Sequence, residues 1–155
     1  MKLPCFIGYD SQEPQSYAVT QFSMERRSSM LLDVHKLGLD DLPAGLFTRP
    51  WHREGLRKVD AQDGKPFSTE FSFTRFLVPT LMNYEGWAIF CDGDFLFLED
   101  VAKLYALRDD KYAVMCVKHH HIPTEETKMD GREQTRYFRK NWSSLVLWNC
   151  SHPAN

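Results

Sequence analysis

The stretch that decides the fold is Trp87-Ala88-Ile89-Phe90-Cys91-Asp92-Gly93-Asp94. Its first five residues are continuously apolar, which is typical of a β-strand buried on both faces. Such strands belong to sheets that are covered by helices on both sides. The apolar run then stops at two aspartates separated by a glycine. Ligands of open α/β sheets bind beyond the carboxyl ends of the strands, so the sequence predicts a binding site here.

The segments on either side of this strand alternate between strand and helix patterns. Strands are expected at residues 3–9, 30–37, 87–91, 112–117 and 145–148, and helices at 14–28, 68–81 and 99–107. This alternation predicts one α/β domain over residues 1–155, with a mostly parallel sheet flanked by helices. Residues 38–66 are rich in glycine, proline and charge, and predict a loop with at most short elements.

Two of the expected helices carry specific predictions. The first is expected to be capped by Asp10 or Ser11, with Pro14 in its first turn. Its buried face is expected to carry Tyr17, Ala18 and Phe22. The second has apolar side chains at helical spacing, with a kink or a new start expected at its proline. These stripe residues are Phe73, Phe76, Leu77 and Leu81, with Thr80 among them and Pro79 as the proline.

Composition excludes several classes of protein. The chain has 155 residues, of which 43% are hydrophobic and 26% charged, with a net charge of −2. This is globular rather than disordered composition, and it provides no basic surface for nucleic acid. No apolar run approaches the roughly 18 residues of a transmembrane helix. The four cysteines are dispersed without a C-x-x-C pair, which predicts free thiols and a cytoplasmic protein.

The Asp92-Gly93-Asp94 motif has a metal-binding and a structural interpretation. Two neighbouring carboxylates repel each other unless a cation lies between them, and Mg²⁺ or Mn²⁺ suits oxygen ligands. Asp-Gly is also a common turn dipeptide. Among enzymes, a phosphohydrolase of the haloacid dehalogenase type uses such a pair as nucleophile and acid/base. A nucleotide-sugar transferase uses it to hold a metal. The mid-chain strand and the following Phe95 favour the transferase.

Four segments together resemble family-8-type glycosyltransferases and their bacterial relatives. They are residues 6–10, FIGYD; 70–79, EFSFTRFLVP; 86–94, GWAIFCDGD; and 139–150, RKNWSSLVLWNC. The resemblance implies a glycosyltransferase A-type fold, which is a nucleotide-diphospho-sugar transferase fold. It also implies a nucleotide-diphosphate-sugar donor and a glycan, lipid or protein acceptor. Mn²⁺ or Mg²⁺ would then be bound by Asp92 and Asp94.

The resemblance further implies a set of donor-binding residues. Tyr9 is expected to stack on the base and Asp10 to accept a hydrogen bond from the ribose or base. Arg75 is expected to leave the core face and lie beside the donor sugar and the acidic pair. No catalytic base is identified. The full set is Gly8, Tyr9, Asp10, Arg75, Gly93, Asn141, Ser143 and Ser144.

The resemblance also predicts a third metal ligand, usually a histidine, from a C-terminal segment. Because the chain ends at Asn155, we expect either a fragment or truncated form, or a metal site that is completed by water, another subunit or one of the histidines. The candidates are His119, His120, His121 and, with less support, His152. A basic stretch with Arg132, Arg136, Arg139 and Lys140 is either a solvated face or a contact for phosphate or an acidic acceptor. The alternative function is a non-catalytic module that binds nucleotide sugars.

Overall fold

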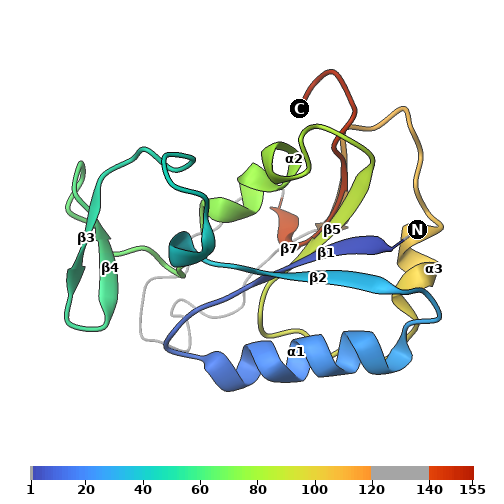
Figure 1. Cartoon of the computed structure of the whole chain (residues 1–155), viewed down its shortest axis with the longest axis horizontal. Coiled ribbons are helices and arrows are strands. Elements are labelled where there is room, and N and C mark those ends of the chain that lie inside the picture. Colours follow the sequence, from blue (N-terminus) through green and yellow to red (C-terminus); the bar gives the residue numbers. More distant parts are fainter. Residues whose placement is uncertain (1, 120–139) are drawn as a thin grey trace.

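The computed structural model describes residues 2–119 and 140–155. Its centre is a five-stranded sheet with the strand order β2-β1-β5-β7-β6 (Figure 1). The strands are β1 (Leu3–Gly8), β2 (Leu32–Leu37), β5 (Trp87–Cys91), β6 (Val114–His119) and β7 (Lys140–Asn149). β1 pairs in parallel with β2 and β5, whereas β7 is antiparallel to both β5 and β6. The sheet is therefore mixed, and β7 is the strand that departs from the expected parallel arrangement.

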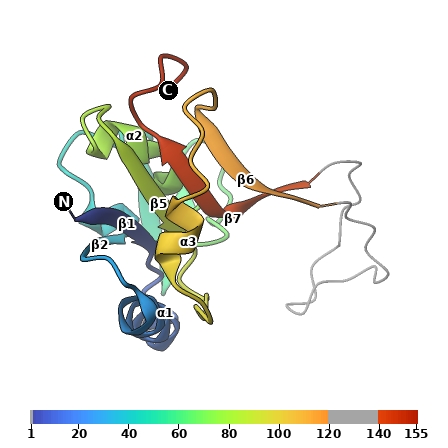
Figure 2. The same ribbon diagram turned by 90° about the vertical axis from the view of Figure 1, so that its right-hand side faces the viewer.

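Both faces of the sheet are covered, as the sequence of β5 predicted. The helix α1 (Pro14–Arg27) covers one face of the sheet. On this face Ile89 and Cys91 pack together with Met24 of the helix. Ala88 and Phe90 pack on the opposite face, against α2 (Val78–Leu81) and the segment before it (Figures 1 and 2). A third helix, α3 (Val101–Tyr105), follows the loop after β5. None of the helices in the described residues is long and apolar enough to cross a membrane.

The buried face of α1 differs from the predicted one. Phe22 is 68% exposed and Ala18 is also exposed, while the helix buries Thr20, Ser23 and Met24. The helix turns these hydroxyls inward because they form hydrogen bonds with the loop after β5. The predicted cap is also wrong: Glu13 occupies the N-cap position and forms no side-chain cap, although Pro14 starts the helix as expected.

Residues 68–81 do not form the predicted continuous helix. A 3₁₀ turn, η2 (Thr74–Leu77), leads into the single turn of α2, and Pro79 lies in the first turn of α2. The tighter 3₁₀ winding shifts the periodicity away from 3.6 residues. Phe76 is therefore 58% exposed, while Arg75, which was expected to leave the core face, is buried.

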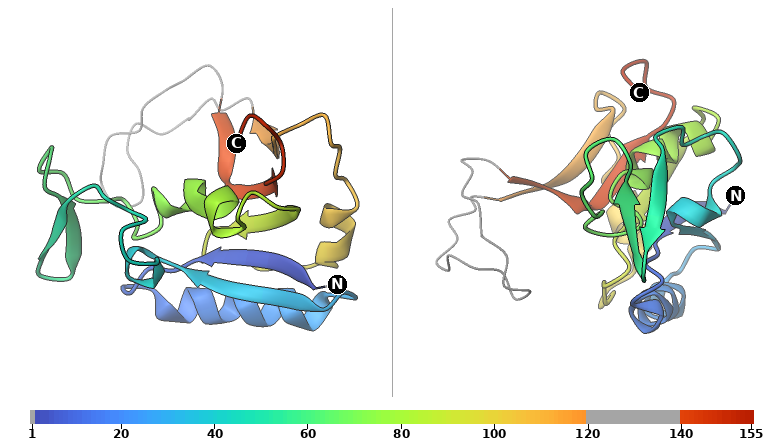
Figure 3. Two further views of the ribbon diagram at one scale, coloured as in Figure 1. Left: turned by 45° about the horizontal axis from the view of Figure 1, so that its top comes forward. Right: turned by 90° about the vertical axis from the view of Figure 1, so that its left-hand side faces the viewer.

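Short elements occupy the irregular region 38–66, as predicted. A 3₁₀ turn, η1 (Leu39–Asp41), precedes a two-stranded antiparallel hairpin of β3 (Trp51–Glu54) and β4 (Arg57–Asp60). Figure 3 shows this hairpin, in teal to green, standing away from the five-stranded sheet. Its position matters because β4 contributes to the cleft described next.

Candidate functional site

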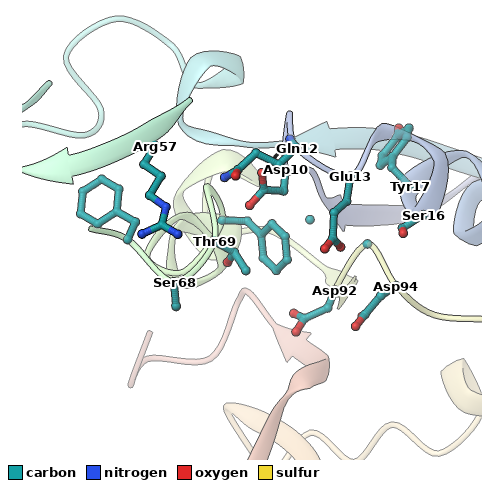
Figure 4. Close-up of a pocket in the computed structure, with 14 residues that line it drawn as sticks. Asp10, Gln12, Glu13, Ser16, Tyr17, Arg57, Ser68, Thr69, Asp92 and Asp94 are labelled. Atoms are coloured by element: carbon teal, nitrogen blue, oxygen red, sulfur yellow. Dashed lines mark hydrogen bonds between the residues drawn. The ribbon is translucent and has the colours of Figure 1, made fainter. Parts of the chain in front are cut away.

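A cleft of about 340 Å³ lies beyond the carboxyl ends of β1 and β5. It contains the acidic pair that the sequence singled out, and Figure 4 shows Asp92 and Asp94 at one end of it. The lining residues come from the β1–α1 loop, the first turn of α1, β4, the segment before η2 and the loop after β5. They are Gly8, Asp10, Gln12, Glu13, Ser16, Tyr17, Arg57, Phe67, Ser68, Thr69, Phe71, Asp92, Gly93 and Asp94.

Two glycines allow the walls of the cleft to approach each other. A Cβ atom on Gly93 would overlap the carbonyl oxygen of Gly8, so the loop after β5 touches the end of β1 through backbone alone. A Cβ atom on Gly8 would lie 2.6 Å from the ring of Phe71. Glycine is required at both positions because of this close packing. The result is a fixed distance between the β1 and β5 walls.

Side chains of α1 hold the loop after β5 in place. The hydroxyl of Thr20 lies 2.8 Å from the carbonyl oxygen of Gly93 and 2.7 Å from that of Phe95, so its one proton serves either oxygen. The hydroxyl of Ser23 accepts a hydrogen bond from the backbone N–H of Phe97 at 3.1 Å. These contacts fix the backbone that carries the two aspartates.

Asp92 and Arg75 form an incompletely satisfied buried pair. Arg75 Nη1 lies 3.1 Å from Asp92 Oδ1, but the two groups are not aligned for a hydrogen bond. Oδ1 is buried and accepts no hydrogen bond within the described part of the chain. Burial raises the pKa of Asp92 to about 6, an increase opposed by Arg75 and reinforced by Asp94. Burial also lowers the pKa of Arg75, although the two aspartates act in the opposite direction.

Arg75 is held mainly by the backbone rather than by the carboxylate. Its guanidinium donates to the carbonyl oxygen of Ser143 at 3.0 Å and to the Ser143 hydroxyl at 3.2 Å. Its Nε lies 3.4 Å from the carbonyl oxygen of Phe71. These acceptors fix the charge of Arg75 next to Asp92 and leave part of the carboxylate free of hydrogen bonds.

The acidic pair fits a hard divalent cation. Asp92 is a half-buried carboxylate whose enclosed Oδ1 accepts no hydrogen bond from the described residues, and Asp94 offers an exposed carboxylate one residue beyond Gly93. Mg²⁺ commonly uses one or two protein carboxylates and completes its octahedron with water and phosphate oxygens. Residues 2–119 and 140–155 contain no cluster of three or more His, Cys, Asp or Glu side chains suited to a metal ion. A cation held by protein ligands here would therefore rest on two carboxylates.

A second charged network, which the sequence patterns did not predict, lies behind the β4 side of the cleft. The side chain of Lys58 on β4 is fully buried and contacts Asp40 at 2.7 Å and Glu70 at 2.8 Å. Glu70 accepts a hydrogen bond from the hydroxyl of Ser11, and its backbone N–H donates to Asp10. This network joins the hairpin to the β1–α1 loop. A lone lysine in a charged stretch carries no sequence signal for such a role.

The structure brings some of the predicted donor-binding residues together and not others. Gly8, Asp10 and Gly93 line the cleft. Tyr9 lies outside the lining set, where its ring packs edge-on against Tyr17 at 5.4 Å and beneath the ammonium of Lys36 at 4.3 Å.

Of the predicted donor-binding residues of β7, Ser143 and Ser144 also lie outside the cleft lining. Ser143 binds Arg75, and the carbonyl oxygen of Ser144 accepts from the backbone N–H of Asp92 at 2.8 Å. Asn141 pairs with Lys118 in the β6–β7 register.

The candidate histidine ligands and the basic stretch lie partly outside the described residues, and His152 lies outside the cleft lining. His120, His121, Arg132, Arg136 and Arg139 fall between residues 120 and 139, outside the described residues. His119 ends β6 and Lys140 begins β7. His152 lies in the final turn, where its Nδ1 accepts a hydrogen bond from the backbone N–H of Ala154.

Comparison with known proteins identifies a relative of this mixed α/β domain. The chain is 48% identical over 151 residues to Protein CDI of Arabidopsis thaliana. The match covers 97% of this chain and 54% of the relative, so the chain spans about half the length of that protein. No family model matches the chain. No solved structure matches it either.

These comparisons correct the assignment to family-8-type glycosyltransferases. The relative that matches along almost the whole chain is named Protein CDI, and neither a glycosyltransferase family nor a solved glycosyltransferase structure matches. The family assignment from the four segments was therefore wrong. The assignment relied on short motifs around a buried strand, and a parallel strand followed by acidic residues recurs in many α/β proteins. The function must be argued from the cleft itself.

Proposed function

We propose that the chain binds a nucleotide-diphosphate sugar in this cleft, with Mg²⁺ or Mn²⁺ at Asp92 and Asp94, and transfers the sugar to an acceptor. The observation that carries the proposal is the pair of carboxylates, Asp92 and Asp94, that line the cleft just beyond the carboxyl end of β5. An anionic diphosphate would be repelled by the four carboxylates of the cleft unless a cation intervened. The acceptor would be a hydroxyl of a glycan, lipid or protein.

The proposed reaction assigns roles to residues that line the cleft and to Arg75, which is buried beside Asp92 outside the lining. The bond between the anomeric carbon of the sugar and the diphosphate oxygen breaks, a bond to the acceptor oxygen forms, and the proton of the acceptor hydroxyl passes to the departing diphosphate. Arg75 contributes fixed positive charge beside the developing negative charge of the leaving diphosphate. A bound divalent cation would supply Lewis-acid stabilisation of the same charge. Asp10 and Glu13 offer carboxylate oxygens to sugar or ribose hydroxyls.

The proposal extends to the fold class and the compartment. A sheet with parallel β2, β1 and β5 and a cleft beyond β1 and β5 is consistent with a nucleotide-diphospho-sugar transferase fold. All four cysteines are free in the structure, and burial raises the pKa of the Cys5 thiol to about 12. Free, unreactive thiols support a reducing compartment, and we infer the cytoplasm.

Isothermal titration calorimetry tests the proposal directly. The protein is titrated with a panel of nucleotide-diphosphate sugars with Mn²⁺ and again with EDTA, and release of free nucleoside diphosphate is measured in parallel. We expect metal-dependent binding that is lost in Asp92→Asn and Asp94→Asn. Asp33→Asn is the matched control, because Asp33 is an exposed aspartate on β2 that pairs with His35.

Other outcomes would select different functions. Metal-independent nucleotide-sugar binding without release of nucleotide would overturn the transferase and support a binding module. Hydrolysis of p-nitrophenyl phosphate that is abolished by Asp92→Asn would replace the proposal with a phosphohydrolase, in which Asp92 is the nucleophile.

A further inference from the structure

The two ends of the cleft differ in charge. Asp92 and Asp94 lie at one end, and Arg57 lies at the other, reaching from β4 toward Ser68 and Thr69 (Figure 4). Of the fourteen described residues that line the cleft, four are acidic and one, Arg57, is cationic. A ligand that spans the cleft therefore meets opposite charges at its two ends.

Among the described residues, Arg57 differs from the nearby cations Arg49 and Arg53 in having no counterion. Arg49 pairs with Asp60, and Arg53 pairs with Asp40 at 2.8 Å. For Arg57, no carboxylate of residues 2–119 or 140–155 lies within ion-pair distance, and its guanidinium makes no hydrogen bond to them. A guanidinium presents five donors in a planar fork that matches carboxylate and phosphate oxygens.

The backbone beneath Arg57 is fixed on both sides. The residue pairs with Glu54 of β3, and the carbonyl oxygen of the next residue, Lys58, accepts from the backbone N–H of Phe67 at 2.9 Å. The buried Lys58 side chain then ties β4 to Glu70. Because this backbone is anchored, the exposed side chain of Arg57 starts from a fixed point of the cleft wall instead of from a loose loop. Such preorganisation lowers the entropic cost of binding a ligand.

We propose that Arg57 binds a negatively charged group, a carboxylate or a phosphate, on the acceptor. This inference rests on the proposed function, in which the donor diphosphate occupies the acidic end of the cleft through a divalent cation. A second anion is repelled by the carboxylates everywhere in the cleft except near Arg57. The bidentate fork would orient the acceptor along the cleft, with its hydroxyl directed toward the sugar at the opposite end.

Nuclear magnetic resonance titration of the full chain in Mg²⁺ tests this subsite. The probes are inorganic phosphate, glucuronate as a carboxylate-bearing sugar, and glucose as its neutral counterpart. The signals are the Arg57 side-chain Nε–H and the backbone amides of Ser68 and Thr69. We expect saturable shifts with phosphate or glucuronate and none with glucose. Phosphate alone or glucuronate alone would identify the group that the acceptor carries.

Variants separate this subsite from general attraction to basic residues. In Arg57→Gln the Ser68 and Thr69 shifts are expected to disappear, and Arg57→Lys, which keeps the charge without the fork, is expected to weaken them. Arg26→Gln removes an exposed arginine of α1 outside the cleft and is expected to leave them unchanged. Asp92→Asn and Asp94→Asn are also expected to preserve them, because these residues act at the other end.

The outcomes distinguish the two proposals. If nucleotide sugars bind through Asp92 and Asp94 but no anion shifts the signals around Arg57, the subsite is wrong and the proposed function stands. Equal shifts in Arg57→Gln and the parent protein would also overturn the subsite. If anions bind at Arg57 while no nucleotide sugar binds, the anion site stands and the transferase proposal falls, together with the assignment of this anion to an acceptor.

Discussion

Two buried cations, Lys58 and Arg75, support the cleft from different sides and are satisfied to different degrees. The ammonium of Lys58 is completely buried and contacts two carboxylate oxygens, one from Asp40 and one from Glu70, at hydrogen-bond distance. Arg75 donates to backbone and hydroxyl oxygens and lies beside Asp92, whose Oδ1 accepts no hydrogen bond from residues 2–119 and 140–155. Lys58 is thus balanced by two carboxylates, whereas the carboxylate beside Arg75 keeps one oxygen that accepts no hydrogen bond from the described residues.

This difference separates a structural ion pair from a candidate binding site. A buried charge is stable when all its partners are supplied by the fold, and an incompletely satisfied carboxylate costs free energy unless a ligand completes it. The Lys58 network therefore serves to fix the hairpin. The Asp92 carboxylate is left incompletely paired by the described residues, which lowers stability. The following predictions test this contrast, from the largest expected effect to the smallest.

Replacing Lys58 should have the largest effect on stability. Lys58→Met leaves the buried carboxylate of Glu70 without its cation, and breaking a buried pair in this way costs about 3–5 kcal/mol. Urea denaturation at pH 7 measures the loss. Lys103→Met is the control, because Lys103 forms an exposed pair with Glu99 and its removal should change stability little. A loss as small as that of the control would show that Lys58 does not hold the hairpin.

Replacing Asp92 should stabilise the protein, which is the opposite of the effect expected for Lys58. The folded state raises the pKa of Asp92 from 3.8 to about 6, so it binds this proton more tightly than the unfolded chain does. This group therefore lowers stability as pH rises from about 4 to about 6, and the full penalty is present at pH 7. Asp92→Asn removes the penalty and should raise the free energy of unfolding at pH 7 by about 2–3 kcal/mol.

The same variant tests the link to metal binding. Mg²⁺ or Mn²⁺ should stabilise the parent protein, by about 2.7 kcal/mol at a hundredfold excess over Kd, and should not stabilise Asp92→Asn. Thermal and urea denaturation between pH 4 and pH 7, with metal and with EDTA, measure both effects. Asp33→Asn should follow the parent protein throughout. An Asp92→Asn protein that is less stable than the parent at pH 7 would contradict the incomplete-pair interpretation.

Removing the Ser143 hydroxyl should have the smallest effect. Ser143→Ala takes away one of the acceptors of Arg75 but leaves the Ser143 carbonyl oxygen in place, so we expect a loss of about 0.5–1.5 kcal/mol. Stabilisation by metal should remain. Calorimetry with a nucleotide sugar provides the second measurement. A large loss of donor affinity without a change in stability would mean that Ser143 contacts the donor directly.

Local sequence patterns were sufficient to predict the strands of the central sheet. The apolar run 87–91 coincides with β5, and the expected strands near residues 3, 30, 112 and 145 overlap β1, β2, β6 and β7. The carboxyl-end position of Asp92 and Asp94 also followed from the sequence, because a buried strand that stops at charge leaves that charge at the sheet edge. The resemblance to a named family did not survive comparison with known proteins.

The sequence by itself therefore determined the buried strand and the acidic pair at its end, and it indicated a globular domain of strands and helices. Only the tertiary structure decided which side chains meet that pair. The burial of Arg75, the displacement of Tyr9 from the cleft and the burial of Lys58 against Glu70 all depend on contacts between segments far apart in the chain. Periodicity reports which face of one element is apolar. It carries no information about which polar partner, on another element, compensates the desolvation of a buried charge.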